Sequence, residues 1–161
     1  MRRLLTFAVL ALALALPVVA GARSRGPNDG TLSIRDAKGI FTINGRGAVI
    51  GSIANGRITI SDPIDGDGTG PIVTGDDFDP VEKNENTTMW RGNKVRFRII
   101  GGTCRVVVNG RGVNLSFVGS GKVILNGRGT EDDGMYSVNG SDYNLVPALA
   151  FPFQLSAVTT P

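Results

Sequence analysis

Asn-Gly pairs recur through this chain and divide it into short segments. They stand at five places: Asn44-Gly45, Asn55-Gly56, Asn109-Gly110, Asn126-Gly127 and Asn139-Gly140. An Asn-Gly pair suits the positive φ angles of a type I′ turn, whose twist matches that of the two strands it joins. The segments between the pairs are short runs rich in Val, Ile, Thr and Phe, a pattern typical of a β-sandwich or barrel. We therefore expect an all-β protein in which each pair is the tip of a hairpin.

The chain also matches itself at a shift of 65 positions, without a gap. Residues 31–60 then fall on residues 96–125, and the Asn-Gly-Arg-Gly run that begins at Asn44 falls on the run that begins at Asn109. The apolar alternation is in phase in four places: Leu32 and Ile34 with Phe97 and Ile99, Phe41 and Ile43 with Val106 and Val108, Ala48 and Ile50 with Val113 and Leu115, Ile58 and Ile60 with Val123 and Leu125. Because this phase decides which face of a strand is buried, we expect two copies, about 30–76 and 95–141.

Each copy is too short to bury a core alone, so the two are expected to share one. We predict an internally duplicated β-sandwich or closed barrel of about ten short strands, with the acidic stretch 76–85 as a linker between the copies. A β-helix is the alternative, because the Asn-Gly-Arg-Gly runs at Asn109 and Asn126 begin 17 residues apart. A solenoid requires that spacing to recur along the chain, and no recurrence is evident. In the tail, Phe151, Phe153 and Leu155 are expected to form an edge strand, because Pro147 and Pro152 interrupt this segment.

The first 22 residues have the features of a signal peptide. Arg2 and Arg3 precede an apolar run, 4–16, and Ala20-Gly21-Ala22 forms a small-residue cleavage site. The run is shorter than the ~20 residues that a membrane-spanning helix needs. We expect a single all-β domain, 23–161, that is secreted or placed in the periplasm or cell envelope of a bacterium and does not span the membrane. Cleavage lowers the basic residues from 17 to 15 against 14 acids, so the net charge of the mature chain identifies no partner.

Missing residue types exclude most enzyme classes. The chain has no histidine, which removes the usual general base, the histidine-dependent triads and most catalytic zinc sites. Its one cysteine, Cys104, cannot form an intrachain disulfide. Cys104 shares strand parity with Val106 and Val108, which predicts a buried, inert thiol. An enzyme built from this chain would have to use carboxylates.

The sharpest acidic motif is a calcium-like loop at residues 65–76. It resembles the twelve-residue calcium loop of EF-hand and dockerin-type repeats, with oxygen-bearing residues at its first, third and fifth places, Gly at the sixth and an acid at the twelfth. The resemblance implies ligands from Asp65, Asp67, Thr69 and Asp76 and from the carbonyl of Pro71. Prolines and the lack of flanking helical periodicity favour a plain acidic turn as the alternative, and calcium is the one cofactor that we consider.

An ordered basic array lies at residues 94–99. Lys94, Arg96 and Arg98 fall on one face of a predicted strand and three apolar residues fall on the other. Such a row can bind an anionic polymer, or it can be a solvated surface balanced by the acidic stretch 76–85. Few aromatic residues are interleaved with it, so we expect no nucleic-acid partner. The repeated Asn-Gly-Arg-Gly run is explained by turn geometry, and we assign it no function.

Three further segments resemble exported β-rich proteins of high-GC bacteria, a group to which no activity is assigned. They are Thr-Leu-Ser-Ile at 31–34, Gly-Ala-Val-Ile-Gly at 47–51 and Asp-Asp-Gly-Met-Tyr-Ser at 132–137. The resemblance implies export and a β fold. We expect a non-enzymatic structural or binding module of the bacterial envelope or medium. The alternative is a carboxylate-dependent hydrolase of an envelope polysaccharide, built on the acids near residues 65–67 and 131–133 with Trp90 beside them in a groove.

Overall fold

The computed structural model describes residues 26–64 and 66–157, and these residues form strands but no helix. The strands are β1 (Gly30–Ser61), β2 (Gly68–Asn84), β3 (Thr87–Gly101), β4 (Thr103–Asn126), β5 (Met135–Val138), β6 (Asn144–Leu145) and β7 (Phe151–Leu155). They pair antiparallel in one sheet of order β2-β3-β1-β4-β7, with β5 on β1 and β6 on β5. The all-β prediction is confirmed. The predicted signal peptide lies outside the described residues. Within the described residues, no helix has the length and hydropathy that crossing a bilayer requires.

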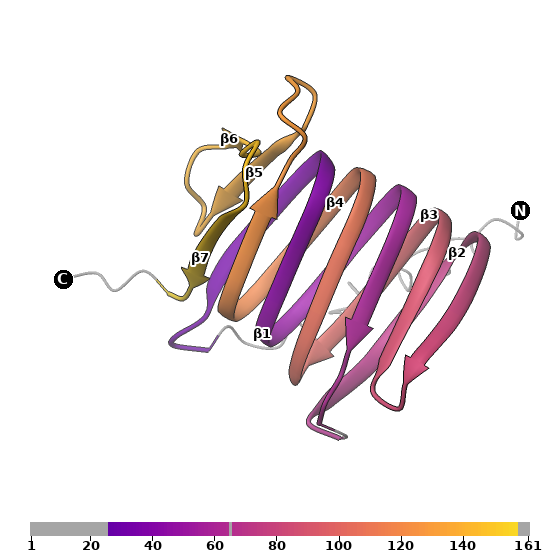
Figure 1. Ribbon diagram of the computed structural model, residues 1–161. Coiled ribbons are helices and arrows are strands. Elements are labelled where there is room, and N and C mark those ends of the chain that lie inside the picture. The colour runs from indigo at the N-terminus through magenta and orange to yellow at the C-terminus, as the bar shows by residue number, and fades with distance from the viewer. Residues whose placement is uncertain (1–25, 65, 158–161) are drawn as a thin grey trace, which may run out of the picture.

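The long strands wind around one another, and Figure 1 shows them as a spiral. Ile43 of β1 pairs with Val106 on one side and with Val123 on the other, 17 positions further along β4. In the same way, Val106 pairs with Ile43 and with Ile60, which are 17 positions apart in β1. One turn of the spiral therefore takes 17 residues. The spacing that the sequence shows between two Asn-Gly-Arg-Gly runs thus does recur, as the pitch of a wound antiparallel sheet.

Opposite sides of the spiral enclose the core, which makes the fold sandwich-like, and the sheet does not close into a barrel. The buried core runs along β1, β3 and β4 and includes Leu32, Phe41, Ile43, Val49, Ile58, Phe97, Val106, Phe117 and Leu125. β2 and β3 form a hairpin in which Asn84 pairs with Thr87. Residues 76–84 of the predicted linker belong to β2 and pair with β3, so this stretch is part of the sheet.

Rows of glycines mark the two bends in each turn. In one row Gly92, Gly56, Gly110 and Gly39 pair successively across four strand segments. A β-carbon on Gly56, where φ is 158°, would lie 2.4 Å from the carbonyl oxygen of Asn109. Only glycine leaves room for so close an approach of the neighbouring backbone. At these bends the strands therefore stay paired with their neighbours, and the chain does not reverse its direction.

These bends correct the hairpin-tip prediction. Asn44 and Asn55 lie inside β1, and Asn109 lies inside β4, whereas Asn139-Gly140 does form a turn after β5. Because strands bend at glycine without ending, the described residues contain seven strands, two of them 32 and 24 residues long, in place of about ten short ones.

The two halves have matching bends. A β-carbon on Gly121, where φ is 152°, would lie 2.5 Å from the carbonyl oxygen of Asn44, as one on Gly56 would approach Asn109. Gly121 lies 65 positions after Gly56, and Asn109 lies 65 positions after Asn44. This is the arrangement that two copies related by a two-fold axis produce, and the duplication stays a prediction.

One part of the predicted alternation is wrong. Ile50 is 55% exposed, while Val49 and Ile53 are fully buried. In the other half, Val113 and Leu115 are buried as expected. Gly112 adopts a φ of 61°, and the buried side of β4 changes there from even-numbered to odd-numbered residues. β1 passes the corresponding bend at Gly47 without that shift, so its odd-numbered residues stay inside.

The open edges of the sheet are protected against further pairing. β2 carries Pro71 and Pro80 together with exposed Asp76, Asp77 and Asp79. Proline lacks the N–H that a new strand would need, and charged edge residues oppose self-association. At the other edge β7 pairs with β4, which confirms the predicted tail strand.

Cys104 is buried as expected, with 2% of its surface exposed and no disulfide partner among the described residues. Burial, followed by the nearby charges of Asp62 and Asp67, raises the pKa of its thiol to about 11. The thiolate is the reactive form. We expect iodoacetamide to leave the native protein unmodified at mildly alkaline pH and to modify it fully in urea. Rapid alkylation of the folded protein would contradict this burial.

Candidate functional site

The predicted calcium ligands that the structure describes do not lie together. Asp65 lies outside the described residues. The Asp67 carboxylate accepts a hydrogen bond from the Thr103 backbone N–H at 2.8 Å, and Asp76 forms an ion pair with Lys94 at 3.0 Å. Thr69 and Pro71 lie along β2, which runs extended between these two acids. A group of three or more acidic or thiol side chains that could hold a metal is absent from the described part of the chain.

The predicted basic array divides into two parts. Arg96 and Arg98 are exposed and alternate with buried Val95, Phe97 and Ile99, as the sequence predicts. Lys94 instead adopts a left-handed φ of 47° and bonds to Asp76 of β2. Asp76 of the edge strand β2 therefore neutralises the charge of Lys94, while among the described residues Arg96 and Arg98 form no ion pair.

The acids near residue 132 have a structural role. Asp133 is 2% exposed, and its carboxylate accepts hydrogen bonds from the backbone N–H groups of Arg128 and Gly129 (both 2.5 Å) and of Thr130 (3.0 Å). Its other oxygen accepts the Thr130 hydroxyl. Burial would raise the pKa of Asp133, but these bonds lower it to about 2. A carboxyl group that stays ionised cannot act as a general acid near neutral pH, so Asp133 cannot supply the acid of the predicted hydrolase.

Charge is strongly segregated along the fold. β1, β3 and β4 carry four, four and three basic residues against one acid, Asp36. β2 carries four acids against one lysine. The formal net charge of only +3 therefore conceals a basic spiral with an acidic edge. The basic part is where an anionic ligand would be attracted.

A hollow of about 610 Å³ lies in this basic part, beside the glycine row that contains Gly56 and Gly92. Its lining consists of Asn55, Gly56, Arg57, Asp77, Arg91, Gly92, Asn93 and Asn109. A second hollow of about 420 Å³ shares part of this lining and consists of Lys38, Asn55, Gly56, Asn109, Gly110, Arg111 and Arg128. We call the two together the edge groove. It follows one bend of the spiral across successive strands.

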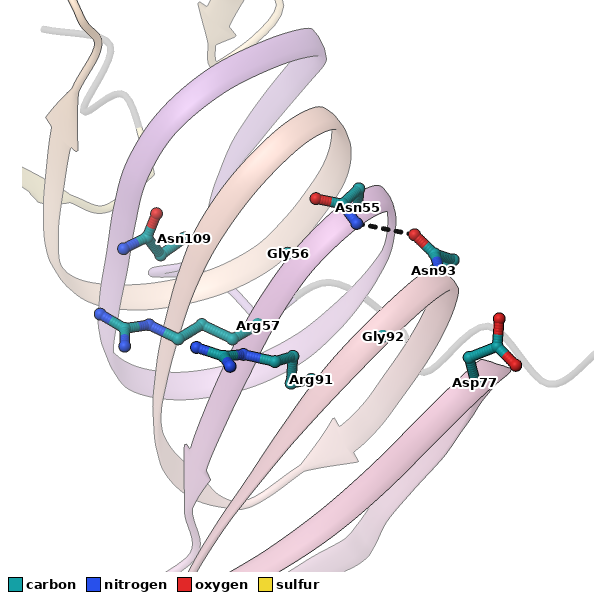
Figure 2. A pocket seen from close by; sticks show the side chains of 8 residues that line it. All are labelled: Asn55, Gly56, Arg57, Asp77, Arg91, Gly92, Asn93 and Asn109. Carbon is teal, nitrogen blue, oxygen red and sulfur yellow. Dashed lines mark hydrogen bonds between the residues drawn. The ribbon is translucent and has the colours of Figure 1, made fainter.

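Two arginines lie directly opposite each other in the groove. Arg57 of β1 pairs in register with Arg91 of β3, and Arg57 is also opposite Asn109 of β4. Figure 2 shows the two arginine side chains running in the same direction, with Asp77 at the far, β2 end of the hollow. Within the described residues neither arginine forms an ion pair. Like charges directly opposite in an antiparallel sheet destabilise it, so this pair costs the fold free energy that a bound anion would return.

The groove also offers amide groups. The Asn55 side-chain nitrogen donates to the Asn93 side-chain oxygen at 2.7 Å, as the dashed line in Figure 2 shows. This bond leaves the other amide atoms of the pair free to meet a ligand. Asn109 is half-buried beside Arg57. The site thus combines guanidinium groups with neutral hydrogen-bonding groups.

Comparison with protein-family models, with curated proteins and with solved structures found no match. The function must therefore be inferred from the geometry of the groove.

The repeated Asn-Gly-Arg-Gly run was assigned only to turns, and Asn55-Gly56-Arg57 has the first three residues of the same run. The structure places three of these runs, at Asn55, Asn109 and Asn126, along one bend, where their arginines line the groove. The fourth, at Asn44, lies at the opposite bend. A further signal was available, because Arg91-Gly92-Asn93 is the same motif in reverse. Antiparallel pairing sets it residue for residue against Asn55-Gly56-Arg57.

Proposed function

We propose that this chain is a non-enzymatic binding module of the bacterial envelope or medium, and that its edge groove holds an acidic polymer. The observation that carries the proposal is the cross-strand pair of Arg57 and Arg91 at the wall of a hollow. An arginine pair of this kind can clamp anionic groups through several charge-assisted hydrogen bonds. Export supports the same proposal, because the predicted signal peptide would bring the groove to the acidic polymers outside the cytoplasm.

The absence of paired carboxylates in the groove favours binding over hydrolysis. Asp77 is the one acid in the lining of the two hollows, and a glycoside hydrolase needs two carboxyl groups that flank the scissile bond. Trp90 lies in β3 next to Arg91, opposite Ile58 and Pro80. With one acid in its lining, the groove has the composition of a site that binds a ligand without cleaving it.

The test is binding of the purified protein to dextran sulfate, with neutral dextran as the control ligand. The double variant Arg57→Gln/Arg91→Gln is expected to bind at least ~10-fold more weakly, because each lost guanidinium removes a charge-assisted contact. The dependence of binding on salt should also become shallower, since fewer counterions are released. Without ligand, the same variant should be as stable as the original protein or more stable, because the repulsion between the arginines is gone.

The matched control is Arg96→Gln/Arg98→Gln, which removes two exposed arginines from the basic array predicted from sequence. It is expected to keep most of the binding. A greater loss in this control than in the groove variant would move the site to the predicted array. Equal binding of dextran sulfate and neutral dextran would overturn the proposed function itself.

A further inference from the structure

The edge groove carries one cation on each of five successive strand segments. In spatial order they are Arg91 on β3, Arg57 on β1, Arg111 on β4, Lys38 on the preceding turn of β1, and Arg128 directly after the end of β4. Neighbouring strands lie roughly 4.8 Å apart, so the five segments extend over about 19 Å across the sheet. Arg91 and Arg57 lie on one side of the glycine row, whereas Arg111, which is opposite Asn55, lies on its other side. A row of this length suits a linear ligand with one negative charge at each step, and is too long for a single small anion.

The four arginines of this row are exposed, and among the described residues none of them is in an ion pair. Lys38 is held at 3.8 Å from Asp132, whose side chain is 79% exposed. An ion pair so exposed contributes little and exchanges readily with a ligand. At the other end Asp77 lies beside the hollow of Arg57 and Arg91, and its charge would repel a polyanion and so define where the bound chain ends.

The neutral groups of the groove indicate what lies between the charges. Asn55, Asn93 and Asn109 present amides, which both donate and accept hydrogen bonds. Sugar hydroxyls also do both, whereas phosphate oxygens only accept. The lining of the two hollows contains no aromatic side chain, although base stacking is the main source of affinity for single-stranded nucleic acid. The combination favours an acidic sugar chain over a nucleic acid.

From this geometry, and resting on the proposed function, we infer that the groove binds a chain of 1→4-linked uronic acids. Such a chain carries one carboxylate on each ring, and the length of a pyranose ring along the chain is close to the spacing between neighbouring strands. Successive rings of such a chain are rotated relative to one another, so its carboxylates point to different sides and would meet the cations on both sides of the glycine row. Each guanidinium can hold a carboxylate through two parallel hydrogen bonds. The hydroxyls of the same rings would bond to the three asparagines. Figure 2 shows the part of this path between Arg91 and Asn109.

The first test is calorimetric titration of the purified protein with oligogalacturonates of increasing length. Affinity is expected to rise with each unit up to about five units, the number of cations in the row, and then to level off. Inorganic polyphosphate and a single-stranded oligonucleotide of equal charge should bind at least ~10-fold more weakly, since they do not match both the spacing and the amides. If either of them binds as tightly as oligogalacturonate, the uronic-acid inference is overturned, while the proposed binding of acidic polymers stands.

The second test separates hydrogen bonding from charge. Asn109→Leu is expected to weaken oligogalacturonate binding about tenfold and to leave polyphosphate binding unchanged. Asn44→Leu is the matched control, because Asn44 occupies the same Asn-Gly-Arg motif at the opposite bend and is exposed. An equal loss in both variants, or a loss for both ligands, would contradict the role of Asn109. The ligand comparison uses the unchanged protein, so it holds even if a variant folds poorly.

Discussion

Gly47→Ala is expected to destabilise the protein by about 3–5 kcal/mol, the sum of overpacking and backbone strain. Gly47 has a φ of 152°, and a β-carbon there would lie 2.2 Å from the Val118 carbonyl oxygen and 2.7 Å from the Gly119 α-carbon. Both contacts are backbone atoms of β4, so no side chain can rotate to make room. The ladder between β1 and β4 would have to open at this bend. Urea unfolding followed by far-ultraviolet circular dichroism measures the loss.

Gly70→Ala is the matched control. Gly70 lies in β2, and a β-carbon there would meet no atom within 4 Å. Its φ is not in the left-handed region, so the free energy of unfolding should change by no more than about 0.5 kcal/mol. If Gly47→Ala were as stable as Gly70→Ala, close approach of the strands would not be what requires glycine at the bends.

The sequence predicted the fold class because alternation and turn signals are local. An Asn-Gly pair shows that the backbone needs unusual φ angles or a small residue at that point. It does not show whether the chain reverses there or bends and continues. That choice depends on the neighbouring strand, as at Gly56, where the Asn109 carbonyl of β4 fills the space that a β-carbon would need. The length of the strands and their winding follow from such distant contacts, and the runs at Asn109 and Asn126 indicated only the 17-residue spacing.

The same limit applies to the placement of the predicted site residues. The calcium motif was judged from spacing alone, but pairing with β3 keeps Thr69 and its neighbours extended. The exposure of Arg96 and Arg98 was predictable, since alternation within one strand decides it. The edge groove joins Arg57 to Arg91 across a register that depends on the whole winding. Only the reversed motif at Arg91-Gly92-Asn93 carried that information in the sequence.

Asp133→Asn is expected to lower stability by roughly 2–4 kcal/mol at neutral pH, because bonds to a buried charged acceptor are among the strongest in a protein. The carboxylate holds three consecutive backbone N–H groups, from Arg128 to Thr130, and the Thr130 hydroxyl. An asparagine amide nitrogen would face some of these donors and leave them unsatisfied. Thermal unfolding measures the loss. Asp132→Asn is the control, because Asp132 is 79% exposed in its ion pair and its replacement should change stability far less than Asp133→Asn does.

The effect of Asp133→Asn should depend on pH in one direction. Hydrogen bonding lowers the pKa of Asp133 to about 2 in the folded protein, below the ~3.9 of an unfolded aspartate. Its stabilisation is therefore complete above about pH 4 and is lost as the pH falls through the folded pKa toward 2. Asparagine does not titrate, so the difference in unfolding free energy between the original protein and Asp133→Asn should shrink over that interval. A difference that stays constant from neutral pH down to the acid limit would mean that the ionised carboxylate does not hold this turn.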